Sequence, residues 1–299
     1  MAKGIVTGVN GPSFTVEVDQ REVACVLRGR LKREWRRTTN VVVVGDVVEV
    51  TRLDDGTGVI EHVAPRRTEL ARPGFRGETQ VMAANVDRLV AVQAARQPAF
   101  QRRLVERFLA LGRQAGIDVL VVVNKCDLVD EALVRSWIAP LIESGVDVLR
   151  TSAVTGEGLD ELRARLSGKV SVLAGKSGVG KSSIVNALLP GMAAARTRAV
   201  SGASARNPGQ HTTTASRLYK LPVGGYLVDT PGVRELGLFE GAEDAVGDVF
   251  PEIERYAAGC RFRDCTHTHE PRCAVKEAVA RGEIDEDRYR HYVKLRSRR

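Results

Sequence analysis

The sequence predicts an α/β protein in which a parallel sheet has helices on both faces, with a small β-barrel before it and a small, mostly helical, metal-binding domain after it. Three observations lead to this prediction. The runs 86–92 and 117–123 are mostly apolar and end in unbroken apolar stretches, 89–92 and 119–123, which is typical of strands buried on both faces of a sheet. Short valine-rich stretches separated by turns come before these runs. A cluster of cysteines and histidines comes after them.

Length and composition limit the class of protein. A chain of 299 residues is long for a single core, so two or three domains are expected. No apolar run approaches the roughly 20 residues of a membrane span, and the first residues lack the apolar core of a signal peptide. We therefore expect a cytosolic protein with no membrane partner. The formal net charge of +8 favours a polyanionic partner such as nucleic acid, although charge alone is weak support.

Residues 1–65 are predicted to form a barrel of the OB type, with an unrelated barrel or sandwich as the alternative. The run 28–37 is strongly basic, contains Trp35 and is expected to lie in a loop. We interpret it as an RNA-binding surface, and a solvated charge run is the competing interpretation. The stretch 64–79 holds Pro65, Pro73, Gly74 and Gly77 together with four arginines, and residues 66–84 are predicted to be a linker. The expected barrel strands are 4–9, 13–18, 22–27, 47–51 and 59–63.

The stretch 170–189 carries the strongest signal in the chain. A buried strand at 170–174 is followed by a glycine-rich loop that fits G-x-x-x-x-G-K-[ST], and then by a helix. The glycines let backbone N–H groups point at a phosphate chain, and the helix N-terminus adds partial positive charge. Lys181 is expected to reach the β- and γ-phosphates as a catalytic group, and the Ser182 hydroxyl to bind Mg²⁺. The predicted phosphate-binding residues are Gly175, Lys176, Ser177, Gly178, Val179, Gly180, Lys181, Ser182 and Ser183.

A second motif predicts which base is bound. The strand 117–123 ends in Asn124, Lys125, Cys126 and Asp127, which fit N-K-x-D. A carboxylate only accepts hydrogen bonds, so Asp127 can take both N–H donors of the guanine edge, which adenine lacks. The Lys125 stem can lie over the base, and Asn124 can tie this loop to the phosphate loop. After the next strand, the Ser152-Ala153 turn can present backbone N–H groups to the guanine O6.

Two further segments are expected to complete the nucleotide site. A threonine in 211–214, with Thr213 favoured over Thr212 and Thr214, could bind Mg²⁺ and sense the γ-phosphate. A plain polar loop is the alternative for this segment. After a strand at 225–228, Asp229 stands where the carboxylate that supports Mg²⁺ belongs, and Gly232 where a backbone N–H meets the γ-phosphate.

The stretch 259–273 predicts a metal site. Cys260, Cys265 and Cys273 with one histidine, His267 or His269, suit tetrahedral Zn²⁺ bound by three thiolates and one imidazole. Four protein ligands leave no open position, so the site is expected to be structural. Helices are expected at 274–281 and 286–295.

The order of the motifs is unusual, because N-K-x-D follows the phosphate loop in ordinary GTPases. Here the order is N-K-C-D, S-A, phosphate loop, H-T-T-T and D-T-P-G. With the barrel before this order, the Cys/His cluster after it, and Q-V-M-A-A-N-V-D at 80–87, the chain resembles the small-ribosomal-subunit biogenesis GTPases, the RsgA family, over nearly its whole length. The resemblance implies a barrel at 1–65, a linker at 66–84, a circularly permuted GTPase domain at 85–238 and a zinc-binding domain at 239–299.

The resemblance also implies an activity and two residue roles. The activity is GTP hydrolysis stimulated by the 30S ribosomal subunit during its late assembly, with binding to 16S rRNA. His267 is implied as the zinc ligand, and His211 as the group that orients the attacking water, since Val233 stands where Ras-like enzymes carry a glutamine. His211 could instead only shape its loop. An RNA-binding switch with incidental turnover and a GTPase with another client are the alternative functions. Nothing in the sequence suggests more than a monomer.

Overall fold

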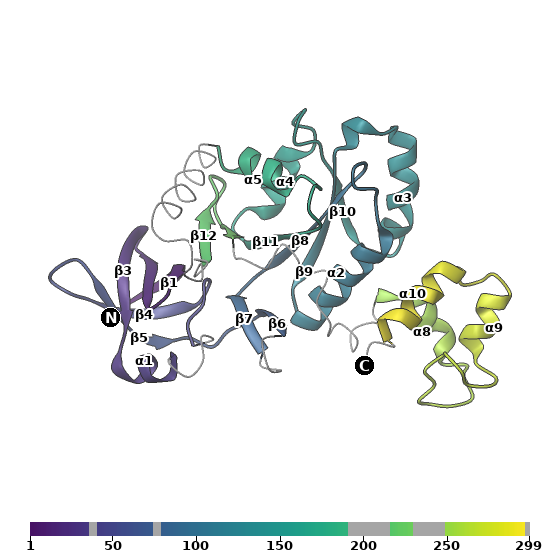
Figure 1. Cartoon of the computed structure of the whole chain (residues 1–299), viewed down its shortest axis with the longest axis horizontal. Coiled ribbons are helices and arrows are strands. Elements are labelled where there is room, and N and C mark those ends of the chain that lie inside the picture. The colour runs from purple at the N-terminus through teal and green to yellow at the C-terminus, as the bar shows by residue number, and fades with distance from the viewer. Residues whose placement is uncertain (36–40, 74–78, 191–215, 230–248, 297–299) are drawn as a thin grey trace, which may run out of the picture.

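The structure is a computed structural model that describes residues 1–35, 41–73, 79–190, 216–229 and 249–296. The chain forms three parts in a row (Figure 1). A β-barrel in purple and blue lies at one end, an α/β part in teal and green lies in the middle, and a helical part in yellow lies at the other end.

The N-terminal part is a closed barrel with strand order β1-β2-β3-β5-β4 and a β1–β4 pairing that closes it. Alternate residues of the strands face its interior, for example Phe14, Val16 and Val18 on β2. This order confirms the predicted OB-type barrel. The strands are β1 (Ala2–Asn10), β2 (Ser13–Val18), β3 (Arg21–Leu27), β4 (Val47–Arg52) and β5 (Gly58–Val63).

The basic run between β3 and β4 was expected to be a loop, and that expectation is wrong for its first part. Gly29–Trp35 forms helix α1. An exposed pair between Arg30 and Glu34, four residues apart, supports the helix. Residues 36 and 37 of the run lie outside the described residues.

The central sheet has the order β10-β9-β8-β11-β13-β12. Its strands are parallel except β12, which runs antiparallel to β13. The carboxyl ends of the parallel strands therefore meet at one edge, where the predicted nucleotide motifs lie. The strands are β8 (Arg88–Ala94), β9 (Asp118–Asn124), β10 (Asp147–Arg150), β11 (Val170–Ala174), β12 (Ser216–Lys220) and β13 (Tyr226–Asp229).

Helices cover both faces of this sheet, because both faces of its central strands are apolar. On β8, Leu89 and Ala91 belong to the core under α2 and α3. Val90 and Val92 of the same strand belong to the core under α4 and α5. This is the alternation that a continuous apolar strand produces. The helices are α2 (Arg102–Ala115), α3 (Glu131–Glu143), α4 (Leu159–Leu166) and α5 (Lys181–Leu188).

The barrel and the central sheet are joined by backbone pairing. β12 pairs antiparallel with β1, with Ser216 opposite Val9, so the two form one 11-stranded sheet. Glu17 of the barrel reinforces the joint, since it accepts hydrogen bonds from Lys220 Nζ at 2.7 Å and from Tyr226 Oη at 2.9 Å.

The segment expected to be a linker contains regular structure. Strands β6 (Glu69–Pro73) and β7 (Thr79–Ala84) form a two-stranded antiparallel sheet. Asn85, just after it, donates to the carbonyl of Gly45 at 2.9 Å and accepts from the Arg67 amide at 2.9 Å. Asp87 then accepts from the Val170 amide at the start of β11, at 2.8 Å. The segment thus connects the barrel to the strand that leads into the phosphate loop.

The C-terminal part has an apolar core to which α2 also contributes. Phe250, Ile253, Val275, Ile284 and Tyr292 belong to this core together with Ala110 of α2. The helices of this part are α8 (Pro251–Ala257), α9 (Ala274–Ala280) and α10 (Glu286–Arg296). Among the described residues, no helix combines the length and the apolar character needed to cross a bilayer.

Candidate functional site

The predicted phosphate loop joins the end of β11 to the start of α5 and has the backbone that its glycines allow. Gly175 and Gly180 have φ of 150° and 96°. A Cβ on Gly175 would overlap the carbonyl of Val92, and one on Gly180 would overlap the side-chain amide of Asn124. Only glycine fits both positions, because each needs a left-handed conformation and a close approach of a neighbour.

Lys181, Ser182 and Ser183 are side chains of this motif that can contact phosphate or Mg²⁺. Lys181 Nζ donates to the carbonyls of Gly175 at 2.6 Å and Lys176 at 2.7 Å, so its ammonium lies across the loop. Ser182 and Ser183 are exposed in the first turn of α5. The Ile184 amide makes the helical bond to the carbonyl of Gly180, and the N-terminus of α5 before it carries partial positive charge, which favours an anion.

Asn124, at the end of β9, connects the base-reading motif to the phosphate loop. Its Nδ2 donates to the carbonyl of Val179 at 3.0 Å. Its Oδ1 accepts from the Ala153 amide at 3.1 Å and from Thr151 Oγ1 at 3.3 Å. One buried carboxamide therefore joins the loops that follow β9, β10 and β11.

Of the other residues of the N-K-C-D motif, Lys125 and Asp127 lie at the site and the Cys126 side chain lies in the core. Lys125 donates through Nζ to the carbonyls of Gly178 and Gln97, both at 2.6 Å. Asp127 is exposed in the short 3₁₀ turn Cys126–Leu128, where its carboxylate can accept from a ligand. The Cys126 side chain instead points into the apolar core, and burial raises the pKa of its thiol. Only the backbone of Cys126 is available to a nucleotide.

The amides expected to face the guanine O6 have acceptors inside the protein. The Ser152 amide donates to the carbonyl of Glu157 at 3.0 Å, and the Ala153 amide to Asn124 Oδ1 at 3.1 Å. A base oxygen at this position would share or displace these bonds. Sequence reasoning did not reveal that these donors already have partners.

The loop between β8 and α2 also borders the site, and sequence reasoning missed it. Gln101 Oε1 accepts from Lys176 Nζ at 2.6 Å, and the Gln97 carbonyl accepts from Lys125. Pro98 lies beside Gly178, with its Cδ 3.6 Å from the position that a Cβ on Gly178 would take. The available signal was that this polar segment follows a buried strand at the same edge as the other motifs.

The predicted Mg²⁺ and γ-phosphate residues are described only in part. Asp229 ends β13, and Val228 before it pairs with Val172 of β11, so the carboxylate lies at the same edge as the phosphate loop. Ser182 lies at the start of α5 on that edge. His211, Thr213 and Gly232 lie outside the described residues, as do Thr212 and Thr214.

The C-terminal part brings the predicted metal ligands together. The ligand atoms of Cys260, Cys265, His267 and Cys273 all lie within 4.8 Å of one another. The Cys260 and Cys273 sulfurs are 3.8 Å apart, and each is 3.4 Å from His267 Nδ1. Zn–S and Zn–N bonds of about 2.3 and 2.0 Å in a tetrahedron give S–S and S–N separations of about 3.8 and 3.5 Å. The four residues therefore fit a tetrahedral cation.

The surrounding loop selects between the two histidines. His267 is buried, whereas the His269 side chain is 82% exposed. The Glu270 carboxylate accepts from the amides of Thr266 at 2.8 Å and Thr268 at 3.0 Å, on either side of His267. The Thr266 hydroxyl also donates to this carboxylate, and its hydrogen bond together with those of the two amides holds the pKa of Glu270 well below its usual range. The loop thus turns His267 inward and leaves His269 outside the cluster.

Comparisons with known proteins agree with this architecture. The family model described as RsgA GTPase matches residues 63–239. A small ribosomal subunit biogenesis GTPase RsgA of Gemmatimonas aurantiaca is 41% identical over 298 residues, which cover 98% of this chain and 96% of that protein. The crystal structure of YjeQ from Thermotoga maritima has a TM-score of 0.75 and 37% identity, and covers 100% of this chain and 99% of that one.

A second solved structure bears on the order of the motifs. YloQ, described as a circularly permuted GTPase, has a TM-score of 0.73 and 30% identity, and covers 99% of this chain and 94% of that one. The permuted α/β fold predicted from the motif order is therefore confirmed, together with the barrel before it. A family model that matches more than half of the chain, and relatives that match nearly all of it, lead to one conclusion. The chain belongs to the RsgA GTPase family.

Proposed function

We propose that this chain hydrolyses GTP to GDP and phosphate in the biogenesis of the small ribosomal subunit. The observation that carries the proposal is the Asn124 side chain, because it ties a guanine-reading loop to a phosphate loop at one edge of the sheet. Relatives named as small ribosomal subunit biogenesis GTPases support the choice of the ribosomal subunit as partner. We place this activity in the cytosol, in a protein that works as a monomer.

Within this proposal, each described residue has a role that follows from its chemistry. Asp127 accepts the two N–H donors of the guanine edge, and the Lys125 stem borders the base. Lys181 and the amides of the phosphate loop balance the charge of the β- and γ-phosphates. Ser182 and Asp229 would hold Mg²⁺, which neutralises developing phosphate charge when it is bound. The roles of His211, Thr213 and Gly232 at the γ-phosphate stay part of the proposal.

The two flanking parts would supply binding and structure. The barrel carries Arg28, Arg30, Lys32 and Arg33 as exposed cations on and beside α1, a surface suited to the phosphates of 16S rRNA. The Cys260, Cys265, His267 and Cys273 cluster would hold one structural Zn²⁺. Binding to the 30S subunit in the presence of a GTP analogue, and not with GDP, is the measurement that tests the partner.

Guanine selection by Asp127 provides the sharpest test of the nucleotide site. Replacing Asp127 with Ala removes both acceptors for the guanine N–H donors, and hydrogen bonds to a charged group contribute about 1.5–3 kcal/mol each. We expect Asp127→Ala to weaken GTP binding at least hundredfold in fluorescence titration with a labelled nucleotide. Asp130→Ala is the matched control, since this exposed neighbour only caps α3 by accepting from the Ala132 amide. Equal affinity of the native protein for ATP and GTP would refute the proposal.

A further inference from the structure

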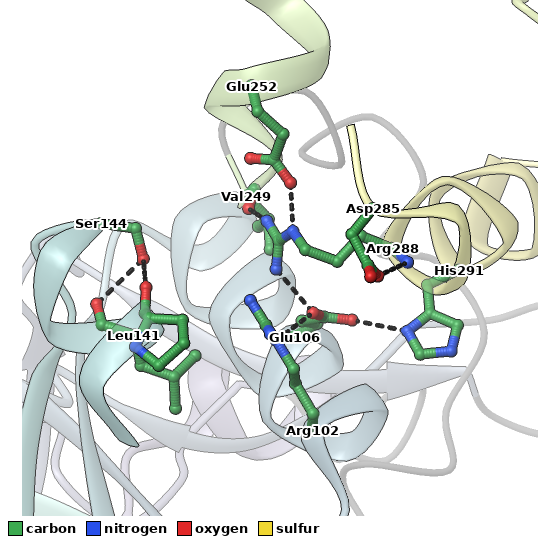
Figure 2. A network of polar contacts seen from close by, with 10 residues as sticks. Arg102, Glu106, Leu141, Ser144, Val249, Glu252, Asp285, Arg288 and His291 are labelled. Carbon is green, nitrogen blue, oxygen red and sulfur yellow. Dashed lines mark hydrogen bonds and ion pairs between the residues drawn. The ribbon is translucent and has the colours of Figure 1, made fainter. Parts of the chain in front are cut away.

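Helix α2 carries a buried carboxylate that nothing in the nucleotide site uses. The Glu106 side chain is 1% exposed. Its Oε1 accepts from Arg288 Nη1 at 2.7 Å, and its Oε2 lies 3.0 Å from His291 Nδ1 (Figure 2). Arg102 on α2 adds an ion pair at 3.3 Å. A buried carboxylate costs several kcal/mol unless it is paired, and two of its partners come from α10 of the C-terminal part.

Arg288 also contacts other residues of the C-terminal part. Besides Glu106, its guanidinium donates to the Glu252 carboxylate of α8 and to the carbonyl of Val249 (Figure 2). It also lies over the Phe250 ring, 4.8 Å from the ring centroid. Helices α8 and α10 therefore contact α2 through one guanidinium and one carboxylate, beside an apolar contact in which Ala110 and Leu109 of α2 pack on the C-terminal core.

The N-terminal end of α2 lies beside the phosphate loop, which belongs to a different part of the chain. Gln101 is the N-cap residue of α2, and its Oε1 accepts from Lys176 Nζ at 2.6 Å. Glu106 follows five residues later, about 7.5 Å along the helix axis. A phosphate is a stronger acceptor for an ammonium group than a neutral amide is, so a bound nucleotide competes with Gln101 for Lys176.

We propose that α2 couples occupancy of the phosphate loop to docking of the C-terminal part, and that Glu106 is the positioning residue for this coupling. The proposal rests on the proposed function and adds a regulatory link to it. Nucleotide binding weakens the hydrogen bond between Lys176 and Gln101. The short helical stretch from Gln101 to Glu106 is stiff, so it transmits the resulting shift to Arg288 and His291. The coupling is reciprocal, so a change in docking alters nucleotide affinity by the same factor.

Hydrogen exchange in the full-length, metal-loaded protein tests the coupling. We expect amide exchange in 286–296 to differ at least threefold between nucleotide-free protein and protein with a non-hydrolysable GTP analogue. Glu106→Gln keeps the shape of the side chain and removes its charge, and Gln101→Ala removes the contact at the other end of the stretch. Both variants should reduce the nucleotide-dependent difference to less than 1.5-fold. Arg290→Ala should keep it, since the ion pairs of Arg290 within the described part of the chain are exposed ones with Glu286 and Asp287 on the same helix.

The outcomes separate coupling from a purely structural role. If Glu106 only stabilised the fold, Glu106→Gln would lower the melting temperature and leave the nucleotide-dependent difference at its native size. That result, or an equal difference in Gln101→Ala, overturns the proposal. Gln101 is exposed, so its variant decides the question even where Glu106→Gln does not fold. Native protein that binds the analogue without any change in 286–296 overturns the coupling alone, whereas absence of guanine-nucleotide binding overturns the proposed function as well.

Discussion

A single carboxamide holds the candidate nucleotide site together. Asn124 is 1% exposed, and it donates to Val179 while it accepts from Ala153 and Thr151. An amide can donate and accept at once, whereas a carboxylate at this position would have no proton for Val179 and would add a buried charge. Asparagine is therefore required at this position, because one side chain must donate to the phosphate loop and accept from the loop after β10.

Gly180 is the position at which a substitution would disturb the contacts of Asn124 most directly. Its φ of 96° is costly for other residues, and a Cβ there would overlap the Asn124 amide. We expect Gly180→Ala to cost about 1–3 kcal/mol of stability and to break the contact between Asn124 and Val179. The affinity for labelled GTP should fall at least tenfold in fluorescence titration.

Gly282 provides the matched control for this prediction. It also has a left-handed backbone, with φ of 75°, but among the described residues nothing beyond its own chain neighbours lies within 4 Å of the position its Cβ would take. Gly282→Ala should therefore cost about 1 kcal/mol of stability through backbone strain alone and leave GTP affinity unchanged. Equal affinities for the Gly180→Ala and Gly282→Ala proteins would show that the contact with Asn124 does not shape the site.

At the scale of elements, the sequence predicted the strands and helices whose apolar pattern is strong. The strands from β8 to β11 are apolar on both faces, and the barrel strands alternate, so both could be placed from periodicity. β12 was not predicted, because only Leu218 of Ser216–Lys220 is buried and its place depends on backbone pairing with β1 and β13. The small sheet formed by β6 and β7 was missed because Pro73, Gly74 and Gly77 and the arginines around them indicate a linker.

The motifs of the candidate site were predictable, but the contacts around them were not. Glycine, lysine and aspartate at fixed spacing indicate phosphate and base binding without any tertiary information. Gln101 and Glu106 carry no such signal, because a polar residue on a helix normally faces water. Only the packing of α10 against α2 makes Glu106 a buried group.

We expect the loop and helices around the metal cluster to form an element that depends on a bound cation. Cys265 and Cys273 belong to the same apolar core as Val275, Ile284 and Tyr292. Structural zinc contributes about 10–16 kcal/mol in small domains, so a chelator should unfold 251–296 and leave the central sheet folded. Metal content and hydrogen exchange measure this outcome. His267→Ala should lose the metal, and His269→Ala should keep it; retention of metal by both variants would contradict the assignment.

At the scale of the whole molecule, the candidate nucleotide site lies between two differently attached parts (Figure 1). The barrel continues the central sheet through the β1–β12 pairing. The C-terminal part contacts α2 through the polar contacts of Glu106, in which His291 also takes part (Figure 2), and through apolar packing on Ala110. A backbone ladder is insensitive to protonation, whereas a buried histidine contact is not.

The His291 contact fits a neutral imidazole. Its Nδ1–H can donate to Glu106 Oε2. Its Nε2 is buried and has no hydrogen-bond partner among the described residues, so a proton there would be an unsatisfied donor in that part of the chain. Burial is the largest effect on the pKa of His291 and lowers it. The hydrogen bond and charge of Glu106 and the charge of Asp287 raise this pKa, and the charge of Arg103 lowers it, but burial outweighs the rise. Arg288 and Arg102 already pair with Glu106, so a further positive charge gains little from this carboxylate.

This protonation state predicts a pH dependence with a definite sign. The unfolded state, with a histidine pKa of about 6.5, binds more protons than the folded state once the pH falls below that value, so stability decreases as the solution becomes more acidic. We expect the unfolding free energy of the metal-loaded protein to fall between pH 7.5 and 5.5. His291→Asn keeps a donor for Glu106 and cannot be protonated, so it should flatten this slope. His269→Asn, at an exposed position, should leave the slope as it is. Equal slopes for the native protein and His291→Asn would show that the contact between α2 and α10 does not respond to protonation of this histidine.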